Sequence, residues 1–471
     1  MSLPGQDTSA LLIDALPEAG VYAVGGSVRD AVLAELGRRK GRQPDEDYLV
    51  TGLPLMTILE RLGRLGRVEV VGASFGVVKF TRRDRTVDIA LPRRERSTGP
   101  HHRDFDVESA PDIPLEEDLG RRDFRMNMMA RDLRTGAIID PYGGRADLEH
   151  GRLDTLRAEA FHEDPLRILR GAQFAARFEL RPTESALAAM RAAADRVATV
   201  APERVADELT KLLTLSEKPS TGFELLRDTG ALVHVMPELL EGWQVEQNQY
   251  HAYTVYYHSL RALDAAPPDL VLRLAGLLHD VGKPRTKEGP HFYGHQQVGE
   301  QMAREMLGRL RFSGEVIDRV ARLIANHMYA TADVITDAGI RRFIRKVGPA
   351  NVDALFALRH ADIVASGLPP HDHGENERFE KRVEAQLHGR PALNVGDLVI
   401  DGGDVMALMR ELGLAGGDFR GDDRVGAALR ACLEEVLEDP ARNERDTLLA
   451  IARRVLTEPT SDIDPHNGTN A

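Results

Sequence analysis

The sequence is poor in cysteine and in long apolar runs, and both shortages exclude whole classes of protein. Cys432 is the single cysteine among 471 residues, which excludes an internal disulfide and a cysteine-based zinc site and fits a reducing compartment. No apolar run approaches the ~18 residues that a membrane span needs, and no charged-then-apolar secretory start is present. We therefore expect a cytoplasmic protein without a membrane anchor.

Positive charge is also in deficit, since the formal net charge at pH 7 is −13. This balance argues against a protein that coats nucleic acid non-specifically. It does not exclude an RNA substrate, because binding needs only a local basic surface. Lysine is scarce and arginine abundant, so most positive groups are guanidinium forks suited to phosphate. Residues 38–40 and 93–94 are therefore candidate RNA contacts, with ordinary solvated surface charge as the alternative.

The remaining composition is that of a globular protein of two to four domains, with 42% hydrophobic and 29% charged residues and no internal repeat. Five short runs rich in valine and isoleucine are predicted strands: 21–24, 46–51, 67–71, 75–82 and 85–90. Ser27–Leu36 and Pro54–Leu65 are predicted helices, with Ser27 as the N-cap of the first.

From residue 151 to 240 the pattern is helical with no strand signal, and the later segments are helical too. The sequence thus predicts an α+β fold with a small mixed-sheet head followed by all-helical segments. The predicted divisions are a head (1–148), a neck (149–240), a histidine-rich segment (241–370), a helical C-terminal segment (371–456) and a disordered tail (457–471).

Two aspartates open the second predicted strand. Asp45 and Asp47 are two residues apart, so on a strand their side chains project to one face and that of Glu46 to the other. Such a pair can share Mg²⁺, which bridges a triphosphate and activates a hydroxyl for in-line attack on the α-phosphorus. These sites usually need a third carboxylate from a neighbouring strand, and Asp88 is the best-placed candidate.

A glycine-rich turn precedes this pair, in the stretch Gly-Gly-Ser-Val-Arg-Asp that begins at Gly25. A turn of this kind entering a helix presents backbone N–H groups to a triphosphate. Gly25, Gly26 and Ser27 are therefore candidate contacts for the β- and γ-phosphates. Arg29 is a further candidate, with a helix-surface ion pair to Asp30 as the alternative. The turn and the aspartate pair together indicate transfer of a nucleotidyl group.

Asp164 and Arg167 are predicted to choose the base, because they are three residues apart on a predicted helix and face the same way. A carboxylate accepts hydrogen bonds and a guanidinium donates several. Cytosine and adenine each offer an amino donor beside a ring-nitrogen acceptor, whereas uracil and guanine reverse that order. Such a polar mismatch discriminates by ~10⁴ or more. The alternative is a capping aspartate with an i,i+3 salt bridge.

The order and the amino-acid sequences of these stretches resemble those of the class II CCA-adding and bacterial poly(A) polymerase family, with a fused HD phosphohydrolase module. The resemblance covers roughly residues 18–455 and rests on several ordered motifs, at residues 25–30, 45–47, 121–124, 163–167, 203–204, 208–209 and 277–283. It implies a template-independent nucleotidyltransferase with tRNA, CTP and ATP as partners.

The resemblance also implies roles for residues of the head and neck. Asp123 and Asn127, four residues apart on a predicted helix, would contact the nucleotide, and Arg122 would reach phosphate. Arg170 is a further nucleotide-binding candidate, and Glu163 would orient an arginine of the same helix.

Two further stretches have expected roles of a different kind. Residues 93–112 show no regular period, and in the resemblance they correspond to the flexible loop that complete CCA-adding members need to switch from C to A. His101 and His102 within it are expected to be solvent-exposed. Glu203 and Arg204 are expected to brace the neck rather than to contact the nucleotide.

The histidine-rich segment has the residue order of an HD metal site, with His258, then His279 and Asp280, then Asp362. Imidazole nitrogen and hard carboxylate oxygen together suit a second divalent metal of the Ni²⁺, Co²⁺ or Mn²⁺ type. The alternative is a degenerate scaffold that only supports RNA.

The roles expected for several other polar residues of the segment are less specific. His295 and His327 lie between the motif positions, as in members with further metal or phosphate contacts, and Lys283 is a candidate phosphate contact. His251, His371 and His373 have no motif position and are expected at the surface.

The leading hypothesis is therefore addition of C-C-A to the 3′ end of tRNA, together with metal-dependent phosphohydrolase activity of the HD module. A CC-only or A-only enzyme or a poly(A) polymerase on the same fold is the nearest alternative. A metal phosphohydrolase whose head merely binds RNA is an alternative of a different class, although the set Asp45, Asp47, Asp123 and Arg167 counts against it.

Overall fold

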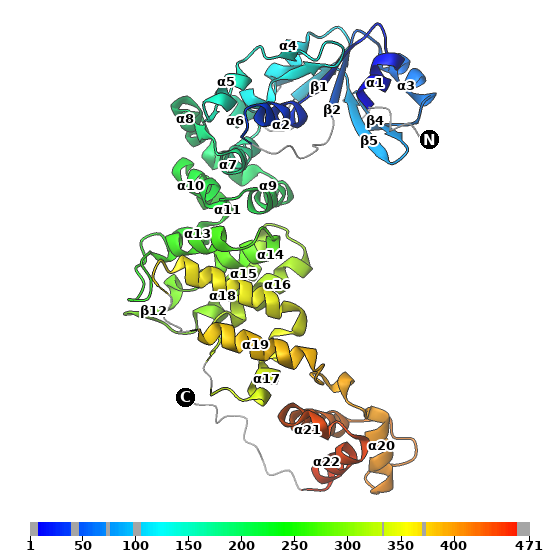
Figure 1. Ribbon diagram of the computed structural model, residues 1–471, viewed down its shortest axis with the longest axis vertical. Coiled ribbons are helices and arrows are strands. Elements are labelled where there is room, and N and C mark those ends of the chain that lie inside the picture. The colour runs from blue at the N-terminus through cyan, green and yellow to red at the C-terminus, as the bar shows by residue number, and fades with distance from the viewer. Residues whose placement is uncertain are drawn as a thin grey trace.

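The computed structural model describes residues 8–38, 47–71, 76–97, 105–331, 334–369 and 374–458 (Figure 1). Some residues of the sequence analysis lie outside these ranges, namely Arg39, Lys40, Asp45, Glu46, His101, His102, His371, His373 and residues 459–471 of the predicted tail. Figure 1 shows an elongated molecule, with the sheet-containing head at one end and the last helices at the other.

The head is built on a seven-stranded mixed sheet in the order β3-β4-β5-β2-β1-β8-β9. β2 and β5 are parallel and the other neighbours are antiparallel. The bounds are β1 Gly20–Val24, β2 Asp47–Thr51, β3 Arg67–Val71, β4 Val77–Arg82, β5 Arg85–Ala90, β8 Ala130–Asp132 and β9 Ile138–Ile139. All five predicted strands are confirmed, and alternate side chains of them, such as Val21, Val50 and Ile89, enter one apolar core.

Among its described residues, the head contains the α-helices α1 Thr8–Ala15, α2 Gly26–Glu35, α3 Leu55–Gly63, α4 Leu115–Gly120 and α5 Gly144–Glu149. The prediction of Ser27 as the N-cap of α2 is wrong, because Gly25 occupies that position. Gly25 has a φ of 72°, a backbone conformation that favours glycine, and the Ser27 hydroxyl instead donates to the Val24 carbonyl at 3.1 Å. The tight turn is therefore made by the glycine and not by a hydroxyl cap.

Residues 93–112 are not irregular throughout, which corrects the sequence-based expectation. Strands β6 Arg93–Ser97 and β7 Phe105–Ser109 pair antiparallel and form an arm beside the main sheet. These strands are rich in charged residues, so they lack the apolar alternation by which strands are predicted. The neck likewise contains a two-residue parallel pair, β10 Arg152–Leu153 and β11 Arg181–Pro182, where no strand was expected.

Helices make up most of the chain after the head. The neck contains α6 Ala160–Glu163, α7 Leu166–Phe178, α8 Glu184–Ala192, α9 Pro202–Leu215, α10 Ser220–Thr229, α11 Leu232–Val235 and α12 Pro237–Glu241. The histidine-rich segment contains α13 Val255–Ala265, α14 Leu270–Leu278, α15 His295–Arg309, α16 Gly314–Asn326, α17 Asp337–Val347 and α18 Val352–Ala365. The C-terminal helices are α19 Glu375–His388, α20 Gly402–Glu411, α21 Asp423–Glu438 and α22 Arg445–Thr457.

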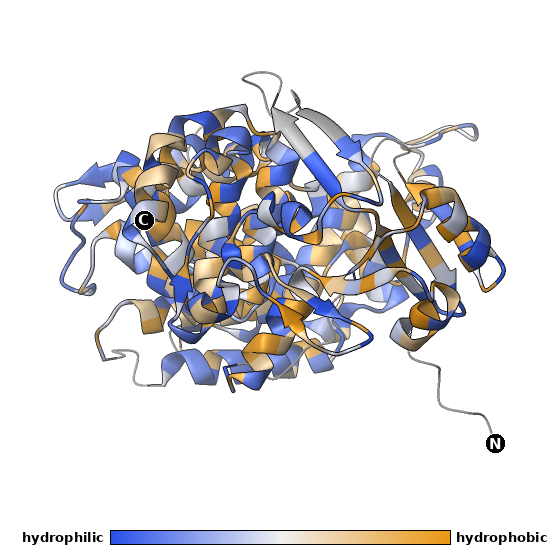
Figure 2. Cartoon of the chain, turned by 90° about the horizontal axis from the view of Figure 1, so that it is seen from above, coloured by the Kyte–Doolittle hydropathy of each residue, from blue (hydrophilic) through white to orange (hydrophobic). Residues whose placement is uncertain are grey.

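One continuous apolar core runs from the base of the head through all the helical segments. Its members include Phe124 of the head, Leu212 of the neck, Leu277 of the histidine-rich segment and Leu433 near the C-terminus. Figure 2 shows that individual helices carry both hydrophobic and hydrophilic residues, as expected for helices with one buried face. This shared core fixes the neck helices against the head and so positions the cavity between them.

Candidate active site and histidine centre

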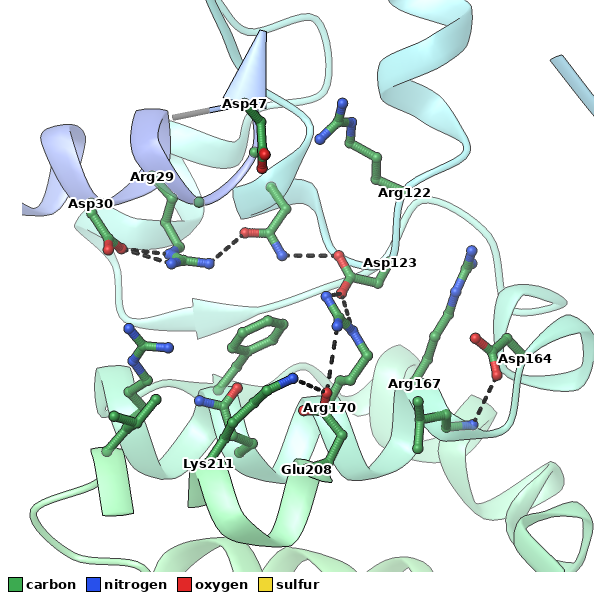
Figure 3. Close-up of a pocket in the computed structure, with 18 of the residues that line it drawn as sticks. Arg29, Asp30, Asp47, Arg122, Asp123, Asp164, Arg167, Arg170, Glu208 and Lys211 are labelled. Atoms are coloured by element: carbon green, nitrogen blue, oxygen red, sulfur yellow. Dashed lines mark hydrogen bonds and ion pairs between the residues drawn. The ribbon is translucent and has the colours of Figure 1, made fainter. Parts of the chain in front are cut away.

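A cavity of about 900 Å³ lies where the head meets the neck, and it gathers motifs that are far apart in the sequence (Figure 3). α2, β2 and the segment after α4 form the head wall, and α7 and α9 form the neck wall. The lining residues are Gly25, Gly26, Arg29, Asp30, Asp47, Arg121, Arg122, Asp123, Asn127, Asp164, Leu166, Arg167, Arg170, Gln173, Phe174, Arg177, Arg204, Glu208, Lys211 and Leu215.

Three of the predicted motifs meet at Gly25. A Cβ atom built on this glycine would lie 3.1 Å from Arg122 Nη1 and 3.9 Å from Asp47 Oδ2. An acidic group and a guanidinium group therefore border the space that a side chain at Gly25 would occupy. A side chain at Gly25 would fill this space and would also strain the backbone, so the position requires glycine.

Asp47 and Asp88 lie directly opposite each other on the parallel strands β2 and β5. Their register places both side chains on the same face of the sheet. Asp88 Oδ1 lies 3.4 Å from Lys79 Nζ of β4, and both of these side chains are partly exposed. The carboxylates of Asp47 and Asp88 fit a hard divalent cation, because they are aligned on adjacent strands and Asp47 lines the cavity.

Arg29 is buried, which corrects the alternative of a helix-surface ion pair. Its side chain is 7% exposed and pairs with Asp30 at 2.7 Å, while Nη1 donates to Asn127 Oδ1 at 2.9 Å. The guanidinium also lies over the Phe178 ring, 4.4 Å from its centroid. Arg29 therefore connects α2 to the Asn127 segment and to the neck helix α7.

The network continues from Asn127 to the neck, as the dashed lines in Figure 3 show. Asn127 Nδ2 donates to Asp123 Oδ1 at 2.9 Å, and Arg170 Nη2 lies 2.7 Å from Asp123 Oδ2. Asp123 and Asn127 do meet, but through a bend and the short 3₁₀-helix η1 Arg125–Asn127 rather than one α-helical face. Arg170 Nη1 lies 3.7 Å from Glu208 Oε1, and Lys211 Nζ donates to the same oxygen at 2.8 Å.

Burial alone would raise the pKa of Asp123. The charge of Arg170 and the hydrogen bonds from Asn127, Arg170 and the Phe124 N–H outweigh this effect and hold the pKa below its ordinary value. Asp123 is therefore a carboxylate that the surrounding donors already satisfy. Its position joins the head to α7 in the middle of the cavity.

Asp164 and Arg167 both line the cavity, but they do not lie on one helix face as expected. Asp164 precedes α7 with an extended backbone, and its Oδ1 accepts from the Leu166 N–H at 3.3 Å. Its Oδ2 pairs with Arg204 Nη2 at 3.0 Å, whereas Arg167 Nη2 donates to the Arg121 carbonyl at 3.0 Å. Among the described residues no side-chain hydrogen bond or ion pair joins Asp164 to Arg167, although the Arg167 backbone N–H donates to the Asp164 carbonyl at 3.0 Å.

Arg167 Nη1 is buried and has no hydrogen-bond partner. A buried donor without an acceptor costs free energy, so this atom favours a ligand that supplies an acceptor. Because Arg167 and Asp164 line the same cavity, a bound group can reach a donor and an acceptor at once.

Asp118 of α4 connects the β6–β7 arm to the arginines of the cavity. Its fully buried carboxylate accepts from the Arg93 backbone N–H at 3.1 Å and pairs with Arg121 at 2.9 Å and Arg122 at 3.2 Å. Burial raises the pKa of Asp118, but the positive charges of Arg121 and Arg122 outweigh it and leave the pKa lowered. Sequence reasoning assigned this residue no role.

We predict that Asp118→Asn lowers the free energy of unfolding by about 2–3 kcal/mol at pH 7. The loss is smaller than the ~3–5 kcal/mol for a fully buried pair, because both arginines are partly exposed. Because the pKa of Asp118 is lowered in the folded protein, its charged carboxylate stabilises the fold at every pH above the ordinary pKa of an aspartate. This stabilisation is lost as the pH falls below about 4. Urea unfolding of the variant and of wild type at neutral and acidic pH measures both effects.

The matched control for this prediction is Glu116→Gln, which removes an exposed carboxylate of the same helix. We expect it to change stability by less than about 0.5 kcal/mol. A stability difference between Asp118→Asn and wild type that does not shrink in acid would contradict the role of the Asp118 charge.

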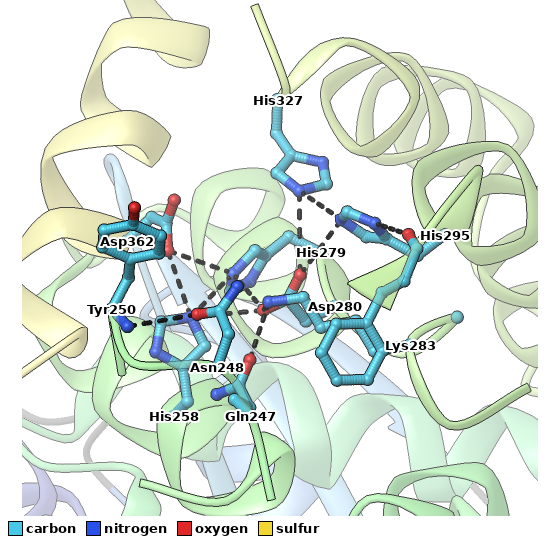
Figure 4. A network of polar contacts seen from close by, with 12 residues as sticks. Gln247, Asn248, Tyr250, His258, His279, Asp280, Lys283, His295, His327 and Asp362 are labelled. Atoms are coloured by element: carbon cyan, nitrogen blue, oxygen red, sulfur yellow. Dashed lines mark hydrogen bonds and ion pairs between the residues drawn. The ribbon is translucent and has the colours of Figure 1, made fainter. Parts of the chain in front are cut away.

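A second polar centre lies inside the histidine-rich segment, in the residues predicted from the HD motif (Figure 4). His258 Nε2 lies 3.1 Å from His279 Nε2, 3.3 Å from Asp280 Oδ2 and 3.1 Å from Asp362 Oδ1. His279 Nε2 lies 3.2 Å from Asp280 Oδ2 and 3.5 Å from Asp362 Oδ1. Helices α13 and α18 and the residues that directly follow α14 thus direct two imidazole nitrogens and two carboxylate oxygens at one point.

His295 and His327 extend this centre on its other side. His295 Nε2 lies 3.2 Å from His327 Nε2, and the two nitrogens lie 3.4 and 3.7 Å from Asp280 Oδ1. Lys283 Nζ lies 2.6 Å from Asp280 Oδ2 and donates to Gln247 Oε1 at 2.7 Å. The donor atoms suit a divalent transition metal, which imidazole and carboxylate ligands accept.

Electrostatics keeps the two acids of this centre charged. Burial raises the pKa of Asp280, but the charges of His279 and Lys283 lower it more, and the net pKa lies well below the ordinary value. The pKa of Asp362 is likewise low, since hydrogen bonds from His258 and His279 outweigh burial. The charged carboxylates of buried Asp280 and partly buried Asp362, close to buried imidazoles, therefore favour a cation.

His251 is not a surface residue, which corrects the expectation from its lack of a motif position. Its ring packs edge-on against His258 with the centroids 4.6 Å apart, and its Nδ1 is buried without a partner. Burial lowers the pKa of His251 to about 4, with the charge of Lys283 as the next cause.

Among the described helices, none combines the length and the apolar character that a membrane span requires.

Comparison with known proteins agrees with this geometry. A family model described as the poly A polymerase head domain matches residues 21–154, a model described as the probable RNA- and SrmB-binding site of polymerase A matches 179–242, and an HD domain model matches 249–347. A multifunctional CCA protein of Nitrosococcus oceani is 40% identical over 80% of this chain and 93% of its own length. The chain belongs to the multifunctional CCA protein family.

Other members of the family and solved structures extend this likeness. A multifunctional CCA protein of Cupriavidus metallidurans is 33% identical over 92% of this chain and 98% of its own length. A Bacillus stearothermophilus CCA-adding enzyme in complex with CTP aligns with a TM-score of 0.68 at 22% identity, over 96% of this chain and 97% of its own. The structural likeness shows that the head, neck and helical segments share the fold of that enzyme.

The structure brings most of the predicted site residues of this chain together. Of the described candidates for the nucleotide site, Ser27 and Asp88 do not line the cavity. Glu163 orients neither Arg167 nor Arg170, because it pairs with Arg157 at 2.9 Å.

Sequence reasoning also missed residues of the cavity. Arg204 was assigned to the neck as a brace, but it lines the cavity and holds Asp164, and Lys211 and Arg177 received no role. The spacing of Glu208 and Lys211, three residues apart on α9, could have indicated that both face the same way.

Proposed function

We propose that this protein adds C and A from CTP and ATP to the 3′ end of tRNA without a template. The observation that carries the proposal is the single cavity with Gly25 and Asp47 on one wall and Asp164 and Arg167 on the other. Relatives named multifunctional CCA protein support it, as do CCA-adding enzymes solved with CTP, with ATP and with tRNA.

Each wall has its own chemical task in this proposal. When bound, Mg²⁺ at Asp45, Asp47 and Asp88 supplies the charge that stabilises the reacting phosphate. The N–H groups of the Gly25 turn and the guanidinium of Arg122 hold the triphosphate. On the neck wall, Arg167 donates a hydrogen bond to the base, and Asp164 accepts a hydrogen bond from the amino group of the base.

The hydrogen-bond network that lines the cavity between the two walls positions these groups and does not react. In the proposal, Arg29, Asn127, Asp123 and Arg170 keep the two walls at a fixed separation around the nucleotide. Their contacts with one another are observed, and the contact of Asp123 or Asn127 with nucleotide belongs to the proposal.

A labelling experiment tests the activity. Purified protein is incubated with tRNA transcripts that end before C-C-A or after C-C, and with an unrelated RNA, with labelled CTP or ATP supplied separately. Addition of C to the first transcript and of A to the second supports CCA addition. Incorporation of only one nucleotide, or long A tails on the unrelated RNA, identifies a partial enzyme or a poly(A) polymerase instead.

The histidine centre favours a second function in the same chain, metal-dependent phosphohydrolysis. We propose a divalent metal of the Ni²⁺, Co²⁺ or Mn²⁺ type at His258, His279, Asp280 and Asp362, with Lys283 beside it as a phosphate contact. The proposed domains are the transferase head (1–148), the base-selecting neck (149–240), the HD domain (241–370) and the C-terminal segment (371–456). A cytoplasmic location, based on the single cysteine, belongs to the same proposal.

We predict that His279→Ala combined with Asp280→Ala removes phosphohydrolase activity on 2′,3′-cyclic phosphate and phosphomonoester ends and leaves nucleotide addition within about twofold of wild type. The two centres share no residue, so the chemistry of one does not require the other. Release of phosphate and incorporation of labelled CTP, measured on one preparation, provide the comparison. Equal hydrolysis by the variant and wild type would contradict the assignment.

A further inference from the structure

The cavity between head and neck extends past the groups that the proposed nucleotide site uses. Asp164 pairs with Arg204 near the start of α7 and α9. Further along the same helices, Arg170 Nη1 lies 3.7 Å from Glu208 Oε1, so the two helices run in the same direction. Beyond that point both helices continue to line the cavity. We call this part the far end, and its residues are Gln173, Phe174, Arg177, Lys211 and Leu215.

The far end is separated from the base-reading side by a pair of charged residues. Figure 3 shows Lys211 on the opposite side of Arg170 and Glu208 from Arg167 and Asp164. On α7 the distance from Arg167 to Arg177 is ten residues, which corresponds to about 15 Å along the helix axis. A base held by Arg167 and Asp164 therefore leaves the far end open to another ligand.

Hydrogen-bond donors and cations dominate the far end. Gln173 is 1% exposed, and its Nε2 is buried without a hydrogen-bond partner. A buried donor without an acceptor costs free energy, so this atom favours a ligand that supplies one. Lys211 Nζ donates to Glu208 Oε1 at 2.8 Å and has two further protons to donate. Because Arg177 adds a guanidinium, a small anion suits this part of the cavity.

Arg29 connects the far end to the glycine turn that would hold the triphosphate. A Cβ atom built on Gly26 would lie 3.3 Å from Arg29 Nη2, and Arg29 Cζ lies 5.5 Å from the centroid of the Phe174 ring. One side chain therefore spans from the turn to the far end. In an in-line displacement the leaving group lies opposite the attacking hydroxyl. Pyrophosphate released at the turn thus has the far end beside it.

A second cavity adjoins the far end on its outer side. Arg177 and Leu215 line both the first cavity and this one, whose volume is about 710 Å³. The exposed cations of the second cavity include Arg38 and Lys218, and its acids are Glu179 and Glu217. Since exposed residues line it, an anion at the far end is next to a cavity that reaches the surface away from the base-reading side.

We propose that Gln173, Arg177 and Lys211 form a holding site for the pyrophosphate that each nucleotide addition releases. The inference rests on the proposed transferase function. In that reaction the RNA 3′ oxygen bonds to the α-phosphorus while the bond from phosphorus to the α–β bridging oxygen breaks. The bridging oxygen leaves with the electron pair as part of pyrophosphate, and the hydroxyl proton passes to water.

Such a site suits an enzyme that adds nucleotides in succession. The next triphosphate needs the glycine turn, and a product that stayed there would block it. Pyrophosphate at the far end leaves the turn and the pair Asp164 and Arg167 open. Entry of the next triphosphate then places two polyanions close together, and their repulsion favours departure of the product through the second cavity.

Calorimetry tests the site without turnover. The full chain is first saturated with a CTP analogue that has a methylene group between the α- and β-phosphorus atoms, which fills the nucleotide site and releases no pyrophosphate. The loaded protein is then titrated with magnesium pyrophosphate, and we expect one to bind per chain. Lys211→Gln and Gln173→Leu should each weaken this binding by about 10-fold, because each removes a donor to a charged ligand. Affinity for the analogue should change by less than about twofold.

Three comparisons separate binding from a structural role. Gln173→Leu removes a buried donor that has no partner, so its melting temperature should not fall while pyrophosphate affinity does. Lys211→Arg keeps a cation at the same place and should restore most of the affinity. Arg191→Gln is the matched control, because Arg191 is an exposed arginine of the neck that lines neither cavity. It should bind pyrophosphate as wild type does.

The remaining outcomes overturn the inference in distinguishable ways. A protein that incorporates C and A, yet binds no pyrophosphate once loaded with the analogue, refutes the holding site and keeps the transferase function. Loss of pyrophosphate binding when a tRNA transcript ending after C-C is added would assign the far end to RNA phosphates instead. An equal loss of analogue and pyrophosphate affinity in both variants would make these residues supports of the nucleotide site. A protein that incorporates neither nucleotide overturns the proposed function and the inference with it.

Discussion

Asp47→Asn should abolish incorporation of CTP and ATP alike while the protein stays folded. Asp47 lines the cavity beside the Gly25 turn and lies opposite Asp88 on the neighbouring parallel strand. Both nucleotides present the same triphosphate to this wall, so loss of a metal ligand cannot distinguish them. A loss of at least about 10³-fold in kcat, equivalent to ~4 kcal/mol of transition-state stabilisation, is expected.

Two further variants define the prediction. Asp45→Asn should have the same effect, since Asp45 is the other member of the predicted pair, and Asp88→Asn should show whether the third carboxylate is needed. Asp84→Asn is the control, because it removes an exposed carboxylate from the turn between β4 and β5. Single-turnover incorporation at saturating nucleotide measures the effect, and near-normal incorporation by folded Asp47→Asn would refute the shared-metal site.

Local patterns predicted the core of the head correctly because its strands alternate or are uniformly apolar. Val21, Val50 and Ile89 enter the core from strands whose bounds agree with the predictions to within about two residues. The arm of β6 and β7 could not be predicted in this way. Its strands are held by their backbone pairing and by contacts such as the Arg93 N–H with Asp118, which leave no apolar period in the sequence.

The site could be predicted where one short motif carries its own chemistry, and less well where the chemistry depends on distant partners. The HD residues are drawn together as their motif indicated, and Gly25 makes the turn that its sequence suggests. The pairing of Asp164 with Arg204, forty residues later, has no local signal. His251 was misplaced for the same reason, because packing against His258 depends on tertiary structure.

For Asp164 and Arg167 the sequence indicated the right residues but the wrong local geometry. Asp164 and Arg167 were expected on one helix face, yet Asp164 ends in an extended conformation before α7 begins. Pro165 directly follows Asp164, and a proline favours an extended conformation for the residue before it. The pair still reaches one cavity, so the functional prediction depends on where the two side chains point and not on helical spacing.

Arg167→Ala should reduce selectivity among nucleotides together with rate. One amino group of the Arg167 guanidinium, Nη2, is fixed by the Arg121 carbonyl at 3.0 Å, and the other, Nη1, is buried without a partner. The ring-nitrogen acceptor of cytosine or adenine would satisfy Nη1, whereas uracil and guanine present an N–H there and leave two donors opposed. We expect kcat/KM for CTP and ATP to fall by about 10²–10³-fold, because the donor contributes ~3–4 kcal/mol to the preferred transition states.

Selectivity carries the decisive part of this prediction. Removing the donor also removes its repulsion of uracil and guanine, so kcat/KM for UTP and GTP should fall much less, and the preference of ~10⁴ for C and A should shrink by the same 10²–10³-fold. Arg167→Lys keeps the charge but not the planar fork and should recover little selectivity. Arg181→Lys, an exposed arginine of the same neck, is the control. Measurement of kcat/KM for all four nucleotides distinguishes the roles: an equal loss for all four, with the order of preference unchanged, would make Arg167 a structural residue that holds Arg121 rather than one that reads the base.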